Sequence, residues 1–129
     1  MATQTLTIEG KNIHDIPSFY DEINRVFMAN ESWKLGPSLD ALDDLLYGGY
    51  GAACGADTLR LIWLNIDHSR AALGVAATRA YYLGKLGKPE FNQTLVRSQL
   101  DDLETGAGRT YFDIVVEIIA AHPNIELEA

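Results

Sequence analysis

The sequence has almost no cysteine and no long apolar run. Its single cysteine, Cys54, cannot form a disulfide within the chain, and no cysteine or histidine spacing matches a zinc site. No apolar stretch reaches the roughly 18 residues of a membrane-spanning helix. The N-terminal sequence MATQTLTIEG lacks the basic and apolar regions of a signal peptide. We therefore expect a cytoplasmic protein that has no membrane segment, no bound metal and no cofactor.

Positive charge is also scarce. The 129 residues include 10 Lys and Arg against 18 Asp and Glu, which gives a formal net charge of −8. Such a surface is repelled by phosphate backbones, so direct binding to nucleic acid is not expected, and long-range attraction favours basic proteins instead. Acidity alone also serves solubility, so the placement of the charges has to carry any functional conclusion.

Hydrophobic periodicity predicts alternating strands and helices. Strands are expected at residues 3–8, 58–66 and 125–128, and the nearly continuous apolar run of the second predicts a central strand buried on both faces. Helices are expected at residues 13–28, 38–46, 69–86 with a break near Gly74, 95–103 and 110–121. Because parallel strands need crossovers, this order predicts one α/β domain over residues 1–129. Its three-stranded parallel sheet would be flanked by helices, with an additional helical insert at about residues 67–107.

Residues 38–46 (SLDALDDLL) are the most informative segment. Ser38 is a good N-cap, and Leu39, Leu42 and Leu46 lie at the spacing of a core-facing stripe. Three aspartates at i, i+3 and i+4 are expected to crowd one outward face: Asp40, Asp43 and Asp44. This acidic face is suited to meeting cations, although a merely solvated helix face would have the same pattern.

Catalysis and metal binding are weaker interpretations of the same carboxylates. A catalytic acid–base pair needs two environments that separate the pKa values of its members in a cleft, and one exposed helical ridge does not provide them. The sequence contains no recognised calcium loop. His14, His68 and His122 fall at predicted turns or helix ends, where surface or capping roles are expected. No catalytic residue is therefore assigned, and we expect a protein that is not an enzyme.

The order of elements and one local motif resemble the barstar family of intracellular ribonuclease inhibitors. The motif is GPSLDALDDLL at residues 36–46. The family has a similar pattern, in which a glycine and a small polar capping residue precede Leu-Asp-Ala-Leu, and one variable residue then separates this segment from an aspartate. The preceding strand and helix fall in matching order, and residues 111–127 look like the family's last helix and strand. The likeness covers residues 3–66 and 108–129, whereas residues 67–107 are longer than in small members and are not matched.

The resemblance implies an inhibitor that plugs the active site of a small basic ribonuclease with carboxylates in place of the substrate's phosphates. Asp44 matches the family position deepest in the phosphate site, and Asp40 and Glu117 match further acidic contacts. Ser38 matches a position that caps the helix and contacts the partner. The remaining expected partner-binding residues are Lys34, Gly36, Asp43 and Tyr50.

Three aromatic positions depart from the family pattern. Asp43 stands where the family typically has an aromatic residue, and Lys34 or Leu35 stands at the aromatic position before Gly36, with Trp33 nearby. Gly49 replaces an expected tryptophan, with Tyr50 adjacent. Since aromatic anchors carry much of an interface's energy, these shifts imply a cognate ribonuclease different from barnase. The alternative is an interaction or regulatory protein of the same fold that does not inhibit a ribonuclease.

Overall fold

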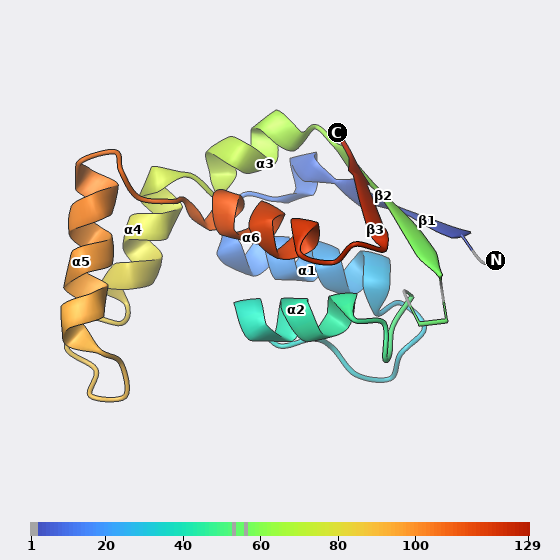
Figure 1. Cartoon of the computed structure of the whole chain (residues 1–129), viewed down its shortest axis with the longest axis horizontal. Coiled ribbons are helices and arrows are strands. Elements are labelled where there is room, and N and C mark those ends of the chain that lie inside the picture. Colours follow the sequence, from blue (N-terminus) through green and yellow to red (C-terminus); the bar gives the residue numbers. More distant parts are fainter. Residues whose placement is uncertain (1–2, 53, 56) are drawn as a thin grey trace.

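The computed structural model describes residues 3–52, 54–55 and 57–129, which form an α/β fold with a three-stranded parallel sheet (Figure 1). The N-terminal half contains β1 (Thr3–Glu9), the 3-10 helix η1 (Gly10–Asn12), α1 (Ile16–Phe27), α2 (Leu39–Leu46) and β2 (Thr58–Leu64). The C-terminal half contains α3 (Ile66–Ala72), α4 (Val75–Leu83), α5 (Gln93–Glu104), α6 (Tyr111–Ala120) and β3 (Ile125–Glu128). The predicted fold class is confirmed, and the break near Gly74 separates α3 from α4.

The sheet has the order β1-β2-β3, and only one of its faces is covered. In register, Ile8 lies beside Trp63 and Leu61 beside Leu127, and these side chains face the helices. The prediction that the central strand is buried on both faces is wrong. Arg60 of β2 lies on the open face, where its guanidinium Nη2 is 2.8 Å from Glu128 Oε2. The strand therefore alternates between buried and exposed residues, as expected when helices cover one side alone.

Trp63 is the centre of the main core. It is fully buried, and its ring stacks on Phe19 of α1 and meets Phe112 of α6 edge-on. Its indole Nε1 donates to Ser69 Oγ at 2.9 Å, and Ser69 Oγ donates to the carbonyl of Gly10. A Cβ on Gly10 would lie 2.4 Å from the Leu64 carbonyl oxygen, so only glycine fits where β1 ends. These contacts join the sheet to α1, α3 and α6.

A buried carboxylate connects β1 to α1. Glu22 is 3% exposed, and its oxygens accept hydrogen bonds from the backbone N–H of Glu9, from Asn12 and from both ends of the Arg25 guanidinium. Burial by itself raises the pKa of Glu22, but the hydrogen bonds from Arg25, Glu9 and Asn12 outweigh it, so the pKa is lowered. The charged form is therefore the one that the fold stabilises.

We expect this carboxylate to make the protein less stable in acid. Because the pKa of Glu22 is lower in the folded than in the unfolded chain, its contribution is full above its ordinary value of 4.5 and is lost as the pH falls through the folded value. Denaturant unfolding of wild type and Glu22→Gln between pH 3 and pH 7 measures this, and the free energy of unfolding of the variant should depend less on pH. Equal pH dependence in the two proteins would contradict it.

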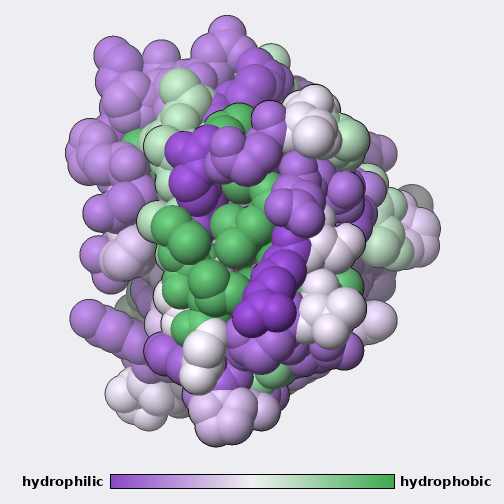
Figure 2. All heavy atoms as spheres, turned by 90° about the vertical axis from the view of Figure 1, so that its left-hand side faces the viewer, coloured by the Kyte–Doolittle hydropathy of each residue, from purple (hydrophilic) through white to green (hydrophobic). Residues whose placement is uncertain are grey.

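The predicted helical insert contains a hairpin formed by α4 and α5 with a small core of its own. Tyr82, Val96 and Leu103 are buried together, apart from the main core. Thr78 and Tyr82 are the buried residues of α4, whereas Leu83 at its end is 50% exposed. The face of the molecule at the hairpin end accordingly carries an apolar patch bordered by polar surface (Figure 2).

Candidate functional site

The helix α2 has the caps and packing that the sequence predicts. Ser38 Oγ accepts a hydrogen bond from Ala41 N at 3.1 Å, which satisfies a free amide of the first turn. Leu42 and Leu46 are fully buried, as is Leu45, which the predicted stripe omitted. Since its inner face is held by three leucines, α2 is a fixed platform for its outward carboxylates.

The three aspartates of α2 do not share one outward face. Asp40 and Asp44 are exposed, but Asp43 is half-buried and its Oδ1 lies 2.7 Å from Nε2 of His122. His122, for which a surface or capping role was expected, is only 4% exposed because it lies just after α6, which packs beside α2. The prediction of a common acidic ridge is therefore wrong for Asp43, which faces the neighbouring helix.

A groove of about 360 Å³ lies between α2 and α6. The apolar part of its lining comes from Leu39, Ile114, Ile118 and Ala121. The charged part consists of the carboxylates of Asp40, Asp43 and Glu117 and the guanidinium of Arg109. The structure thus brings Glu117 to the same groove as Asp40, although the two are 77 positions apart in the sequence (117 minus 40). Glu117 is already paired, because its Oε2 lies 2.7 Å from Nη1 of Arg109.

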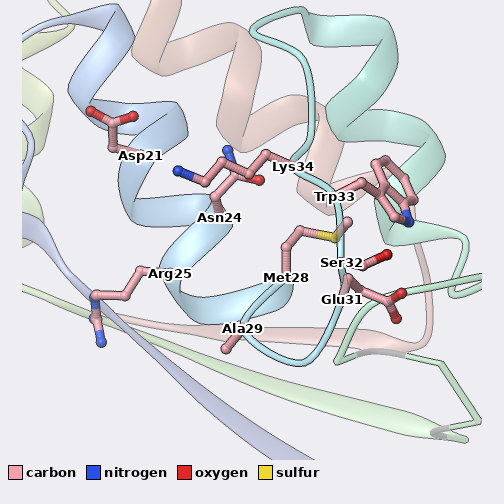
Figure 3. A pocket seen from close by; sticks show the side chains of 9 residues that line it. All are labelled: Asp21, Asn24, Arg25, Met28, Ala29, Glu31, Ser32, Trp33 and Lys34. Atoms are coloured by element: carbon pink, nitrogen blue, oxygen red, sulfur yellow. The ribbon is translucent and has the colours of Figure 1, made fainter.

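Trp33 and Tyr50, the aromatic residues that lie next to the family's aromatic positions, contact each other on the side of α2 away from the α2–α6 groove. The rings of Trp33 and Tyr50 have centroids 4.9 Å apart, and Figure 3 shows Trp33 extending from its loop towards α2. Burial and the negative charge of Asp44 raise the pKa of Tyr50, so Asp44 lies close enough to act on the phenol. The charge of an exposed carboxylate therefore acts on one member of the aromatic pair.

Lys34 is directed away from this aromatic pair. It lines a pocket of about 440 Å³ beside α1, and its side chain extends over Asn24 towards Asp21 (Figure 3). The loop is held by Asn24, which accepts from Leu35 N at 2.7 Å and donates to the Leu35 carbonyl. Trp33 lines the same pocket, so the two side chains border one surface, with the indole on its α2 side and the lysine on its α1 side.

The loop after α2 is tied to the end of α1. Ala52 N donates to the Phe27 carbonyl at 2.7 Å, and Gly51 N donates to Glu31 Oε1. Gly51 has a φ of +75°, a conformation in which glycine is favoured, and a Cβ there would approach the Phe27 carbonyl to 3.0 Å. These contacts fix the position of Tyr50 next to it.

Sequence reasoning missed two residues of this site and one contact. His122 and Arg109 were not assigned to the site, and the Trp33–Tyr50 contact joins two loops. Arg109 lies before the N-cap of α6, so helical periodicity does not relate it to Glu117, and no local pattern in the sequence reveals the pair. Gly36 has no neighbour that a Cβ would touch, so its expected role does not come from lack of space.

Neither a metal site nor a membrane-spanning helix is found in the described part of the chain. Among residues 3–52, 54–55 and 57–129, no group of three or more His, Cys, Asp or Glu side chains could hold a metal ion. No helix in these same ranges is long and apolar enough to cross a membrane.

Comparison with known proteins gives one match. A family model described as Barstar (barnase inhibitor) matches residues 3–85, and no curated protein and no solved structure matches the chain. The match spans the elements from β1 to α4, so it includes α3 and α4, which the sequence likeness had left unmatched. It ends before α5, α6 and β3, and Glu117 and Arg109 therefore lie outside the matched residues.

Proposed function

The chain belongs to the barstar family, and from this premise we propose that it inhibits a small basic ribonuclease by blocking its active site. The observation that carries the proposal is the fixed helix α2, which holds two exposed carboxylates: Asp40 at the α2–α6 groove, and Asp44, whose charge acts on Tyr50 of the aromatic pair. A ribonuclease site that holds phosphate offers cationic side chains, and carboxylates on a rigid helix can take the place of the phosphates.

Charge supports this mode of binding. Neither Asp40 nor Asp44 forms an ion pair with another described residue, so both carboxylates are available to a partner. The net charge of −8 attracts a basic protein over a distance, which accelerates the first encounter, and charge pairs that lose water in the interface slow dissociation. Both effects weaken as salt concentration rises.

The geometry gives each residue a distinct role in the proposed interface. Asp44 would enter the phosphate site next to the aromatic pair, and Asp40 would act at the α2–α6 groove with Glu117. Asp43 would act indirectly, because it is held by His122. Ser38 would keep the first turn of α2 in place.

Titrating a barnase-type ribonuclease with the protein tests the proposal. Stoichiometric loss of RNA cleavage, reversed by high salt, is the expected result. Affinity capture from the source cells provides the second arm, in which a small basic nuclease should be retained. If micromolar protein leaves cleavage unchanged and the captured partner is not a nuclease, the chain is an interaction protein of this family without ribonuclease inhibition.

We expect Trp33→Ala to weaken binding about thirtyfold, which corresponds to roughly 2 kcal/mol for the loss of an aromatic anchor. Trp33 is 46% exposed, so its removal should leave the fold intact. Calorimetric titration of the ribonuclease measures the effect. Leu95→Ala is the matched control, since it removes an exposed apolar side chain from α5 instead. Equal affinities of the two variants would show that Trp33 lies outside the interface.

A further inference from the structure

Arg109 occupies the α2–α6 groove in the free protein. Its Nη1 lies 2.7 Å from Glu117 Oε2, and the same groove is lined by Asp40 and Asp43. Two of these three carboxylates are therefore already matched within the chain, Asp43 by His122 and Glu117 by Arg109. Asp40 is the one groove carboxylate without an ion pair among the described residues. A basic side chain entering the groove thus meets one available carboxylate instead of two.

The two internal pairs differ in how readily they can be exchanged. The His122 side chain is 5% exposed, so separating it from Asp43 would leave its buried Nε2 without this partner. The Arg109 side chain is 65% exposed and that of Glu117 is 54% exposed, and such surface pairs contribute little to stability. Arg109 is therefore the cation that a partner can replace at small energetic cost.

The chain around Arg109 also offers the displaced side chain another position. Arg109 lines a second cavity, of about 150 Å³, together with Asp102 and Gln99 of α5. The backbone just before it is held in place, because the N–H groups of Ala107 and Gly108 both donate to the Asp102 carbonyl at 2.9 Å. The backbone of Arg109 is thus fixed between the α2–α6 groove, which contains Glu117, and a smaller cavity, which contains Asp102.

We propose that Arg109 is a specificity-determining residue that fills the cation position of the α2–α6 groove until a basic side chain of the partner replaces it at Glu117. The inference rests on the proposed function for its biological setting. Its physical content is a competition between two cations for one carboxylate. The apolar lining from Leu39, Ile114 and Ile118 suits the methylene stem of an arginine, and its head group would bridge Asp40 and Glu117. Partners without such a side chain gain nothing from displacing Arg109 and are disfavoured.

The test is a double-mutant cycle with two cationic probes, barnase and a hexa-arginine peptide. Binding is measured by calorimetry for wild type, Arg109→Gln, Glu117→Gln and the double variant. Arg109→Gln should bind both probes about threefold more tightly, the size expected for one exposed ion pair. This gain should disappear in the Glu117→Gln background. Arg97→Gln, which removes the same charge from the exposed surface of α5, is the control and should give a clearly smaller gain.

The outcomes separate this inference from the proposed function. A gain that persists without Glu117, or one that Arg97→Gln reproduces in full, overturns the inference, because general charge would then explain it. If barnase is inhibited equally by all variants, the inhibitor function stands and the inference fails. If no variant binds barnase but the peptide shows the predicted coupling, the inference stands and inhibition of barnase fails. Thermal unfolding confirms that each variant is folded.

Discussion

Asp44→Ala is expected to abolish tight inhibition of the cognate ribonuclease while leaving the protein folded. In the proposed complex the carboxylate of Asp44 meets cations that have lost their water, and truncating one member of such a pair leaves the other buried without a partner. The expected loss is about 3 kcal/mol or more, which raises Kd by at least about a hundredfold. Stopped-flow association and competition for dissociation would show the loss mainly in the dissociation rate.

The free protein should tolerate this change. Asp44 is exposed near the C-terminal end of α2, where a negative charge is unfavourable towards the helix dipole, so its removal should leave the melting temperature unchanged or slightly raised. Asp101→Asn on α5 is the matched control for charge, and it should bind almost as tightly as wild type. An Asp44→Ala variant of near-normal affinity would rule out the assigned mode of binding.

Trp63→Ala is expected to lower the free energy of unfolding by about 3–5 kcal/mol, because a fully buried aromatic side chain leaves a cavity among Phe19, Phe112 and Ser69. Urea unfolding followed by circular dichroism measures the change. Trp63→Phe keeps most of the volume but loses the hydrogen bond to Ser69, so a loss of about 1–2 kcal/mol is expected.

The same variant separates folding from binding. Trp63 does not reach the partner-facing side of α2, so the folded fraction of Trp63→Ala should keep the wild-type Kd, and only the amount of active protein should fall. Trp33→Ala should show the reverse pattern, with weakened binding and nearly unchanged stability. If Trp63→Ala unfolds within about 1 kcal/mol of wild type, the role assigned to this residue as the centre of the core is wrong.

Local sequence signals account well for the elements. The caps at Asp15, Ser38 and Thr110 and the glycine between α3 and α4 are short-range features, and the structure has helices at each of them. The face of a strand depends instead on what the chain packs elsewhere. Arg60 in the apolar run of β2 was the visible sign of an open face, but its partner Glu128 is 68 positions away, so no local pattern reveals the pair.

The outward position of two acidic side chains could be predicted from the sequence, whereas their surroundings could not. A helical pattern places Asp40 and Asp44 outward, and both are exposed. The environment of Asp43 depends on His122, 79 positions along the chain, and the groove depends on how α6 packs beside α2. Charge pairs of this kind follow from tertiary packing, which periodicity does not encode. Partner contact remains a prediction for all eight expected residues: Lys34, Gly36, Ser38, Asp40, Asp43, Asp44, Tyr50 and Glu117.

We expect the α4–α5 hairpin, which has a small core of its own, to be less stable locally than the sheet. The main core joins the sheet to α1, α2 and α6. The hairpin has the smaller core of Tyr82, Val96 and Leu103 and is joined to the main core through α4, where Tyr111 N donates to Thr78 Oγ1 at 2.7 Å. A unit with so few buried contacts opens by local unfolding at a lower free energy than the sheet. Arg109 lies between this unit and α6, so opening of the hairpin loosens the backbone that presents the arginine. We therefore expect the occupancy of the groove to depend on the local stability of the neighbouring hairpin.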